Sequence, residues 1–319
     1  MKDEAPSLRH LPLALFAAPM GLGSVGFAWR EAARVLDAPP AIGEALLALT
    51  ALCWGALGLL HAWRAIRHGD ALLADLRHPV RCCFAAAATI GLMIVAGALA
   101  PYAMGAARTT WLVAVVGQVA IAAWVVRALV VAPRELSVIT PVMLLPLVGN
   151  ILAPVFGPRL GFPELSWMMF GIGALLWAAL HPLLLLRLAT GPALPPRLLP
   201  SVVILLAPPA VGSLALAALL GGFGPAPLAV LGLAVLVALV LLTMAPALAR
   251  APFGPGWWAF TFPTGSFAAA LLAAAEAPGM AWPAAPLWLA LLVVSWIVGV
   301  VSWQTFRAAR EGAFLRPEG

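Results

Sequence analysis

The sequence predicts an all-α integral membrane protein that crosses the bilayer ten times. Of its 319 residues, 64% are hydrophobic and only 9% are charged, whereas soluble domains are about half apolar and about a quarter charged. The mean hydropathy is +1.04. The apolar residues form ten segments of about the 20 residues that a helix needs to cross the hydrocarbon layer. We therefore expect one transmembrane domain over residues 1–319, with short tails and no soluble domain.

The ten expected spans follow one another with short connections. The first begins after the charged stretch MKDEAPSLRH and has no small-residue cleavage site behind it, which indicates a retained helix and not a secretory signal. Short connections favour antiparallel neighbours, so we expect five helical hairpins. The spans are predicted at residues 11–29, 41–63, 79–100, 109–131, 138–157, 165–188, 200–221, 225–248, 257–276 and 285–306.

The basic residues predict the orientation of the chain. With both termini on one side, that side holds 14 of the 18 Lys and Arg residues, and basic loops are retained in the cytoplasm. We therefore expect a multi-pass protein of the cell inner (plasma) membrane with both termini cytoplasmic. The cytoplasmic set is Lys2, Arg9, Arg64, Arg67, Arg77, Arg81, Arg127, Arg134, Arg187, Arg197, Arg250, Arg307, Arg310 and Arg316, and the outer set is Arg30, Arg34, Arg108 and Arg159.

Interior prolines alternate along the chain. The first, fifth, seventh and ninth spans carry them, for example Pro19, Pro209 and Pro263, whereas the second and fourth spans have none. Proline removes a helix hydrogen bond, and a span tolerates it mainly where the freed carbonyl faces protein or a wet cavity. The pattern favours kinked odd-numbered helices around a central path, with the even-numbered helices outside against lipid. Prolines are also simply more frequent in membrane helices, which is the alternative explanation.

The sequence lacks the residue patterns of an enzyme or a metalloprotein. It has no Ser/His/Asp set, HExxH motif, paired carboxylates or glycine-rich phosphate loop. Its three cysteines form no zinc or disulfide pattern. We expect no catalytic activity, no cofactor and no metal. The basic residues are scattered at span ends and form no patch for nucleic acid, so the expected partners are the lipid bilayer and small inorganic anions.

No charged side chain is expected deep in the membrane, where ion-coupled carriers and pumps usually hold one. Glu44, Glu164 and Glu276 lie near the outer span ends, which favours a passive path. Asn150, the only asparagine, could donate its amide to a permeating anion or bond across helices, and both roles stay open. The polar residues expected at depth are Thr89, Gln118, Asn150, Ser213, Thr243, Thr261, Thr264 and Ser266.

Five stretches in five of the spans together resemble a known family. They are LPLALFAAPMGLGSVGFAW at 11–29, RHPVRCCFAAAATIGLM at 77–93, PLVGNI at 146–151, FGIGALLWAALHPLLLLRL at 170–188 and WWAFTFP at 257–263. Each stretch is weak alone. In this order, on ten expected spans, they resemble the tellurite-resistance/dicarboxylate transporter family, which includes bacterial TehA and the slow-type anion channels of plant guard cells.

The resemblance implies a bundle whose odd-numbered helices line a central pore, in a homotrimer with one pore in each protomer. It further implies an aromatic pore plug at Phe262, a second pore aromatic at Phe16 and a fifth-helix asparagine at Asn150. The chain departs from the family pattern at Ala17 and Thr89, which affects the expected pore width and gating. With Phe262 as the gate, the candidate pore-lining residues are Phe16, Pro19, Thr89, Asn150, Pro209, Pro263, Thr264 and Ser266.

These observations predict a passive anion channel for chloride, other halides and nitrate, with Phe262 as a hydrophobic gate. The alternative is a carrier or efflux permease for C4-dicarboxylates, sulfite or tellurite-related oxyanions. Trp257 and Trp258 begin the ninth span and are expected to anchor it at the inner headgroups. Only the resemblance distinguishes Phe262 from Phe260 and Phe267 in the same helix.

Overall fold

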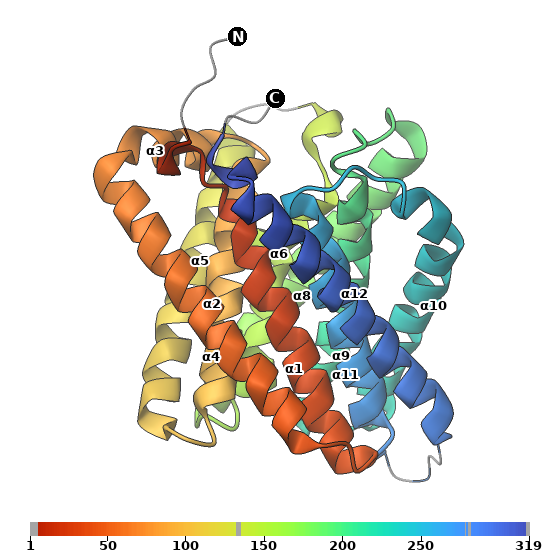
Figure 1. The fold of residues 1–319 in the computed structure, drawn as a ribbon. Coiled ribbons are helices and arrows are strands. Elements are labelled where there is room, and N and C mark those ends of the chain that lie inside the picture. Colours follow the sequence, from red (N-terminus) through yellow and green to blue (C-terminus); the bar gives the residue numbers. More distant parts are fainter. Residues whose placement is uncertain (1–5, 132–134, 278, 280–281, 317–319) are drawn as a thin grey trace.

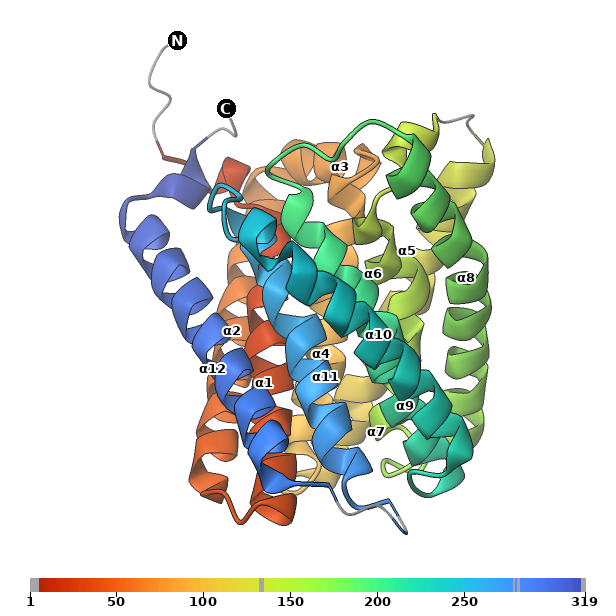
Figure 2. The same cartoon turned by 90° about the vertical axis from the view of Figure 1, so that its right-hand side faces the viewer.

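The computed structural model describes residues 6–131, 135–277, 279 and 282–316 as a bundle of helices without a strand in these ranges (Figures 1 and 2). Lys2 and Arg134 of the predicted cytoplasmic set lie outside the described residues. The α-helices are α1 (Ala17–Val35), α2 (Pro40–Arg67), α3 (Gly69–Arg77), α4 (Ala85–Leu99), α5 (Met104–Val131), α6 (Leu144–Val148), α7 (Ala153–Phe156), α8 (Pro163–Thr190), α9 (Ala207–Leu220), α10 (Pro225–Leu248), α11 (Thr261–Ala274) and α12 (Ala284–Arg310).

Seven helices in the described ranges are long and apolar enough to cross a membrane. The three other predicted ranges hold less apolar or shorter helices. In the first, α1 carries Arg30, Glu31 and Arg34 near its end. In the fifth, residues 141–156 are divided into four short helices, and in the ninth, α11 has only 14 residues. The seven helices are Pro40–Arg67, Arg81–Leu99, Met104–Val131, Pro163–Thr190, Leu199–Leu220, Pro225–Leu248 and Ala284–Arg310.

Two kinds of helix build the bundle. We call α2, α5, α8, α10 and α12 the continuous helices, because each runs for 24 to 28 residues without interruption. The broken segments instead begin with a short 3-10 helix (η) and change to α-helix further along. They are η2–α1 (13–35), η3–α4 (81–99), η5–α6–η6–α7 (141–156), η7–α9 (199–220) and η8–α11 (255–274).

The two kinds also differ in burial. In the apolar stretches of Arg81–Leu99 and Leu199–Leu220, 61% and 72% of the residues are buried, against 17% to 28% in the continuous helices. Large apolar side chains on the continuous helices are exposed, among them Leu59, Val116, Leu175, Leu242 and Trp296. A helix that presents such side chains outward is suited to contact with lipid.

The prolines of the broken segments stand where an α-helix begins. Pro19, Pro146 and Pro263 are each the third residue of an α-helix, and Pro208 and Pro209 are the second and third residues of α9. The first N–H groups of an α-helix have no acceptor within that helix, so a proline in the first turn removes no hydrogen bond of the helix. The mid-helix kinks expected from the sequence are therefore replaced by changes from 3-10 to α-helix. The prolines that do lie inside a helix, Pro182 and Pro246, belong to continuous helices.

Helices α1 and α11 lie side by side at unusually close range. A Cβ atom at Gly21 would stand 2.0 Å from the hydroxyl oxygen of Thr261, and one at Gly265 would stand 2.2 Å from that of Ser24. Each helix thus supplies a glycine against a polar side chain of the other. Small residues allow this approach in membrane bundles, and it fixes the start of α11 against α1.

The two described ends of the chain lie together. The backbone N–H of Ser7 donates a hydrogen bond of 2.8 Å to the carbonyl oxygen of Leu315, and both ends are at the top of Figure 1. We call this the terminal end of the bundle and the opposite one the far end. The carboxyl ends of α1, α4 and α9 lie at the far end (Figure 1).

Candidate functional site

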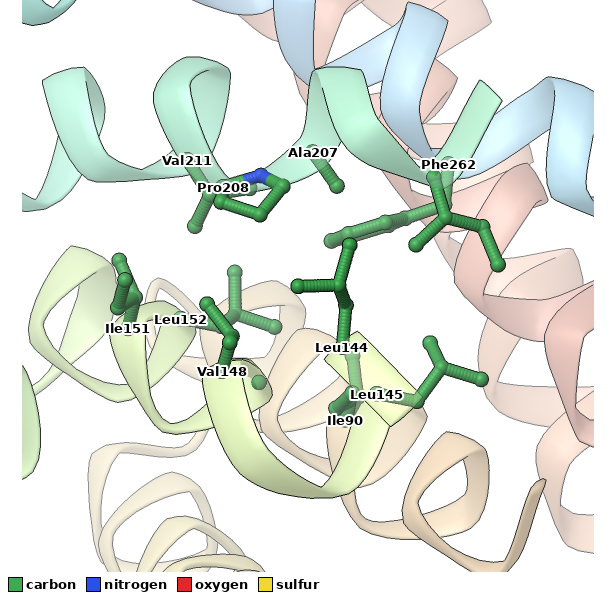
Figure 3. Close-up of a pocket in the computed structure, with 12 residues that line it drawn as sticks. Ile90, Leu144, Leu145, Val148, Ile151, Leu152, Ala207, Pro208, Val211 and Phe262 are labelled. Atoms are coloured by element: carbon green, nitrogen blue, oxygen red, sulfur yellow. The ribbon is translucent and has the colours of Figure 1, made fainter. Parts of the chain in front are cut away.

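Phe262 lies where three cavities of the bundle meet. It is the second residue of α11 and is 9% exposed. Its side chain lines an open cavity of about 1290 Å³, which we call the vestibule, and two small cavities of about 30 and 40 Å³. The vestibule is formed by the ends of α1, α4, α7 and α9 at the far end of the bundle. In Figure 3 the Phe262 ring projects from α11 toward Leu144 and Ala207.

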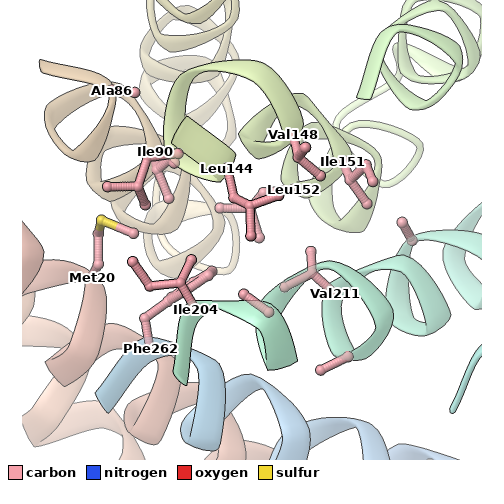
Figure 4. Packing of buried hydrophobic residues seen from close by; sticks show 14 of the residues in the cluster. Met20, Ala86, Ile90, Leu144, Val148, Ile151, Leu152, Ile204, Val211 and Phe262 are labelled. Atoms are coloured by element: carbon pink, nitrogen blue, oxygen red, sulfur yellow. The ribbon is translucent and has the colours of Figure 1, made fainter. Parts of the chain in front are cut away.

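The cavity of about 30 Å³ is lined without a charged or hydroxyl side chain. Figure 4 shows Met20, Ile90, Leu144, Ile204 and Phe262 converging from different helices at this level. About 10–15 Å³ suffices for one water, but a water also needs polar partners. The cavity therefore has the size but not the chemistry to hold water. Its lining residues are Ile90, Leu144, Leu145, Val148, Gly149, Ile151, Leu152, Ile204, Ala207, Pro208, Val211 and Phe262.

Sequence reasoning did not find these aliphatic neighbours of Phe262. Leu145 and Ile204 line both small cavities, and Leu152 and Val211 line both the vestibule and the cavity of about 30 Å³. Nothing in the sequence separates them from the many leucines and valines that face outward. What these four residues share is a position in the broken segments, either within a 3-10 helix, as for Ile204 and Leu152, or in the α-helix that follows one.

Three predicted residues of α11 lie close to Phe262. Ser266 lines the vestibule, and Pro263 lines the cavity of about 40 Å³ on the terminal side of the ring. Thr264 instead turns back on its own helix, because its hydroxyl donates to the carbonyl of Phe260 at 2.5 Å. The neighbouring rings of Phe260 and Phe267 line none of the three cavities. The geometry thus distinguishes Phe262 from the two other phenylalanines independently of any resemblance.

Phe16, Pro19 and Pro209 are buried at other places. The Phe16 ring stacks on His61 of α2, with ring centroids 5.0 Å apart, and lines none of the three cavities. Pro19 and Pro209 occupy the first turns of α1 and α9. A pore-lining role for these three residues stays a prediction from the sequence.

Thr89 joins a polar chain behind the apolar cavity. Its hydroxyl donates to the side-chain oxygen of Gln118 at 2.5 Å. The Gln118 amide donates in turn to the carbonyls of Leu145 and Pro146 at 3.1 and 3.2 Å. These bonds link α4, α5 and α6, and they satisfy backbone oxygens at the point where α6 gives way to a 3-10 helix. Gln118 is fully buried, so the chain braces the broken fifth segment from behind.

Asn150 lies in the same break. Its amide donates to the carbonyl of Leu147 at 3.1 Å and approaches that of Pro146 at 3.4 Å. The side chain is fully buried and lines none of the three cavities, and its oxygen has no hydrogen-bond partner among the described residues. The amide therefore bonds within its own segment and not across helices, which was one of the two roles left open by the sequence. Contact with an anion stays a prediction.

The ninth span begins differently from its sequence-based interpretation. Trp257 is partly exposed, and its indole N–H donates to Pro252 at 3.1 Å. Trp258 is only 3% exposed, and its indole N–H donates to the hydroxyl of Thr305 in α12 at 3.0 Å. Trp258 therefore packs the η8–α11 segment against α12 and does not anchor the span at headgroups.

Charged side chains gather at both ends of the bundle. At the terminal end, the buried guanidinium of Arg64 pairs with Asp75 at 2.6 Å, and Arg81 approaches the same carboxylate at 3.2 Å. Arg9 pairs with the exposed Asp70 and holds the pKa of that carboxyl below its usual range. In the described part of the chain, no group of three or more His, Cys, Asp or Glu could hold a metal ion.

At the far end, arginines and glutamates line the vestibule. Arg30 and Glu44 form two parallel hydrogen bonds of 2.8 and 2.7 Å. Arg34 contacts Glu31 at 2.8 Å and Glu276 at 2.5 Å, and so ties the end of α1 to the residues after α11. These pairs form a rim around the wide side of the site.

The sequence matches a family model over residues 10–303, and the family is described as voltage-dependent anion channel. The match covers nearly all of the chain and includes all five broken segments.

Curated relatives come from plants and bacteria. The chain is 25% identical over 285 residues to the S-type anion channel SLAH2 of Arabidopsis thaliana, covering 84% of this chain and 53% of the relative. It is 24% identical to the guard cell S-type anion channel SLAC1 of the same plant, covering 95% of this chain and 58% of the relative. It is 26% identical to the tellurite resistance protein TehA homolog of Haemophilus influenzae, covering 81% and 79%. The chain thus spans little more than half the length of these plant relatives.

Proposed function

Because this chain belongs to the voltage-dependent anion channel family, we propose that it is a passive channel for small monovalent anions, with chloride, other halides and nitrate as substrates. The family consists of anion channels and transporters and not of enzymes. A multi-pass membrane location agrees with the seven long apolar helices in the described ranges.

In this proposal, the five broken segments surround the anion path and the five continuous helices face outward. Together they make ten crossings arranged as five hairpins. The support is the difference in burial between the two kinds of helix. In addition, nearly all residues that line the two small cavities belong to broken segments or to the turns beside them.

The gate is the ring of Phe262. The observation that carries this assignment is that Phe262 is the one side chain common to the vestibule and both small cavities. A ring at such a junction separates the open vestibule from the two small cavities. A hydrophobic constriction blocks ions because water leaves it, and an ion without water around it is costly. Turning or removing the ring opens the path.

The path stabilises an anion only weakly. No charged side chain lines the cavity of about 30 Å³. On either side of it, Ser266 lines the vestibule, and Ser201 and Arg197 line the cavity of about 40 Å³. With hydroxyl dipoles and no fixed charge at the narrowest part, selectivity follows the cost of dehydration. Nitrate, bromide and iodide are therefore expected to permeate at least as well as chloride.

The deciding experiment removes the ring. Phe262→Ala, recorded in oocytes or a planar bilayer, should raise anion current about tenfold or more, since tenfold corresponds to only about 1.4 kcal/mol of barrier. The matched controls are Phe260→Ala and Phe267→Ala, which shorten phenylalanines of the same segment that line none of the three cavities. Their current should stay near that of the unchanged protein.

Three outcomes would contradict the proposal in different ways. An unchanged current in folded Phe262→Ala protein would show that Phe262 is not the gate. Reversal potentials that follow a cation gradient would show that the protein is not an anion channel. Saturable flux with counterflow in proteoliposomes would indicate a carrier or efflux permease for C4-dicarboxylates, sulfite or tellurite-related oxyanions.

The proposal extends to assembly and orientation. We propose a homotrimer in the cell inner membrane, each protomer with its own path, and with the terminal end in the cytoplasm. The exposed apolar side chains of the continuous helices provide surface for both lipid and neighbouring protomers. Native mass measurement in detergent tests the trimer. Protection of a tag behind residue 316 in sealed cells tests the orientation, because a cytoplasmic tag is reached only after lysis.

A further inference from the structure

The vestibule carries charges that the gate does not require. Arg30, Arg34 and Arg159 line it together with Glu31 and Glu276. These five side chains come from α1, from the turn after α7 and from the residues after α11. They surround the wide opening that leads to Phe262.

Two of the three arginines are neutralised by close partners. Arg30 is held by Glu44 through two hydrogen bonds, and Tyr102 donates a third to the same carboxylate at 2.8 Å. Arg34 stands between Glu31 and Glu276. Three carboxylates, Glu44, Glu31 and Glu276, thus stand against two guanidiniums, which leaves one negative charge that only Arg159 is placed to offset among the side chains that line the vestibule.

Arg159 is the one of these three arginines that contacts no carboxylate of the described residues. It is exposed, and it makes no hydrogen bond or ion pair with the residues that the structure describes. Arg159 lies within electrostatic range of the Glu31 carboxylate, which Arg34 contacts directly. The guanidinium of the nearby Arg108 is engaged with the carbonyl of Leu160 at 2.9 Å.

We propose that Arg159 is an anion-capture site of the vestibule, which gathers small inorganic anions before they reach Phe262. The inference rests on the proposed anion path and adds a second site in the vestibule that Phe262 also lines. An unpaired guanidinium at the wide side of a cavity attracts anions from solution without binding them so tightly that they stay. Its role is to raise the local anion concentration on one side of the membrane.

The expected size follows from Coulomb attraction. At about 7 Å in water, one unit charge changes the local concentration of a monovalent anion about threefold, and a reversal of that charge changes it about sevenfold. Screening limits the effect. The screening length is about 30 Å at 0.01 M salt but only about 3 Å at 1 M. The influence of Arg159 should therefore be visible in dilute salt and vanish in concentrated salt.

The first experiment compares Arg159→Ala and Arg159→Glu in a planar bilayer at low and high chloride concentration. At low salt, current carried by anions that enter from the vestibule should fall about threefold and about sevenfold, with less change in the opposite direction. At 1 M salt the variants should equal the parent. The control is Arg77→Glu, the same charge change at an exposed arginine of the terminal end that lines none of the three cavities.

The second experiment sets the charge chemically after folding. In Arg159→Cys, a cationic thiol reagent should restore the low-salt current and an anionic one of similar size should lower it further. The chain has three native cysteines, of which Cys82 and Cys83 are buried, and the same reagents on the parent protein correct for Cys53. Because only the sign of the added charge differs, a loss of folding cannot imitate the result.

The outcomes separate this inference from the proposed function. The capture site is overturned if the Arg159 variants conduct like the parent at low salt, if their loss persists at 1 M salt, or if both thiol reagents act alike. If neither the parent protein nor Phe262→Ala carries anions, the proposed function itself fails and the capture site fails with it. Both sets are measured on the full chain, in the parent and the Phe262→Ala backgrounds.

Discussion

The broken segments and the continuous helices are both apolar, yet they are used in opposite ways. The 3-10 start of η7–α9 leads into a segment of which most residues are buried, whereas α10, which follows it directly in the chain, buries only 17% of its apolar stretch. In water, hydrophobicity separates a core from a surface. In a bilayer it does not, because lipid is as apolar as leucine. Here helix breaks and small residues mark the interior.

The largest effect is expected when one methyl group is added to a broken segment, and the same addition to a continuous helix serves as the comparison. Gly265→Ala in α11 places a Cβ 2.2 Å from the hydroxyl of Ser24 and 3.2 Å from its backbone carbon. Overpacking of this kind costs about 1–3 kcal/mol, so the melting temperature in detergent should fall by several degrees. Gly299→Ala in α12 meets nothing within 4 Å, and its melting temperature should stay unchanged or rise. Equal effects at both positions would remove the distinction between the two kinds of helix.

An effect of similar size is expected from the polar brace of the fifth segment. Gln118→Leu removes the donors to Leu145 and Pro146 and the acceptor of Thr89. Leaving buried carbonyls without donors costs about 1–3 kcal/mol, which thermal unfolding should detect. Thr243→Val, on the exposed side of α10, removes only a bond of its hydroxyl to Val240 in the same helix. If the two variants melt alike, Gln118 does not brace the break.

The smallest effect is expected at Pro263. As the third residue of α11 it stands in a first turn, where a missing N–H matters little. Pro263→Ala should therefore change stability by less than about 1 kcal/mol and leave anion current within about twofold of the parent. The hinge expected from the sequence makes the opposite prediction, because straightening a kink beside Phe262 would alter the current strongly. Recordings of the same variant decide between the two.

The sequence predicted the long spans well and the breaks only in part. The predicted range 225–248 coincides with α10, and 109–131 lies within α5 and shares its last residue. Long apolar runs determine such helices almost alone. A 3-10 helix bonds each carbonyl to the N–H three residues ahead, and an α-helix to the one four residues ahead. A hydropathy profile does not distinguish these two patterns, so the 3-10 starts were not predicted. The prolines indicated the right segments but the wrong geometry.

Residue type alone did not indicate the candidate site, since the chain holds 13 phenylalanines and 30 prolines. The resemblance pointed to Phe262, and Ser266 and Pro263 beside it also line cavities. Thr89 and Asn150 were selected because they are polar at depth. In the structure, however, the Thr89 hydroxyl bonds to Gln118 or the carbonyl of Ala86, and the Asn150 amide bonds to the carbonyl of Leu147. Ile204 and Leu145 could not be selected at all, since their neighbours in space come from distant parts of the chain.

Helix α1 shows a limit of identifying membrane helices by their hydropathy. It contacts four other helices, α2, α4, α11 and α12, as a helix at the centre of a bundle does. Its sequence contains several glycines, which have no side chain to separate the helices. Those glycines and the charges near its end lower its hydropathy, so it is absent from the seven helices that length and composition identify. Hydropathy measures what a helix offers to lipid. Because α1 packs mainly against other helices, it has little surface for lipid, and a hydropathy profile therefore does not identify this central helix.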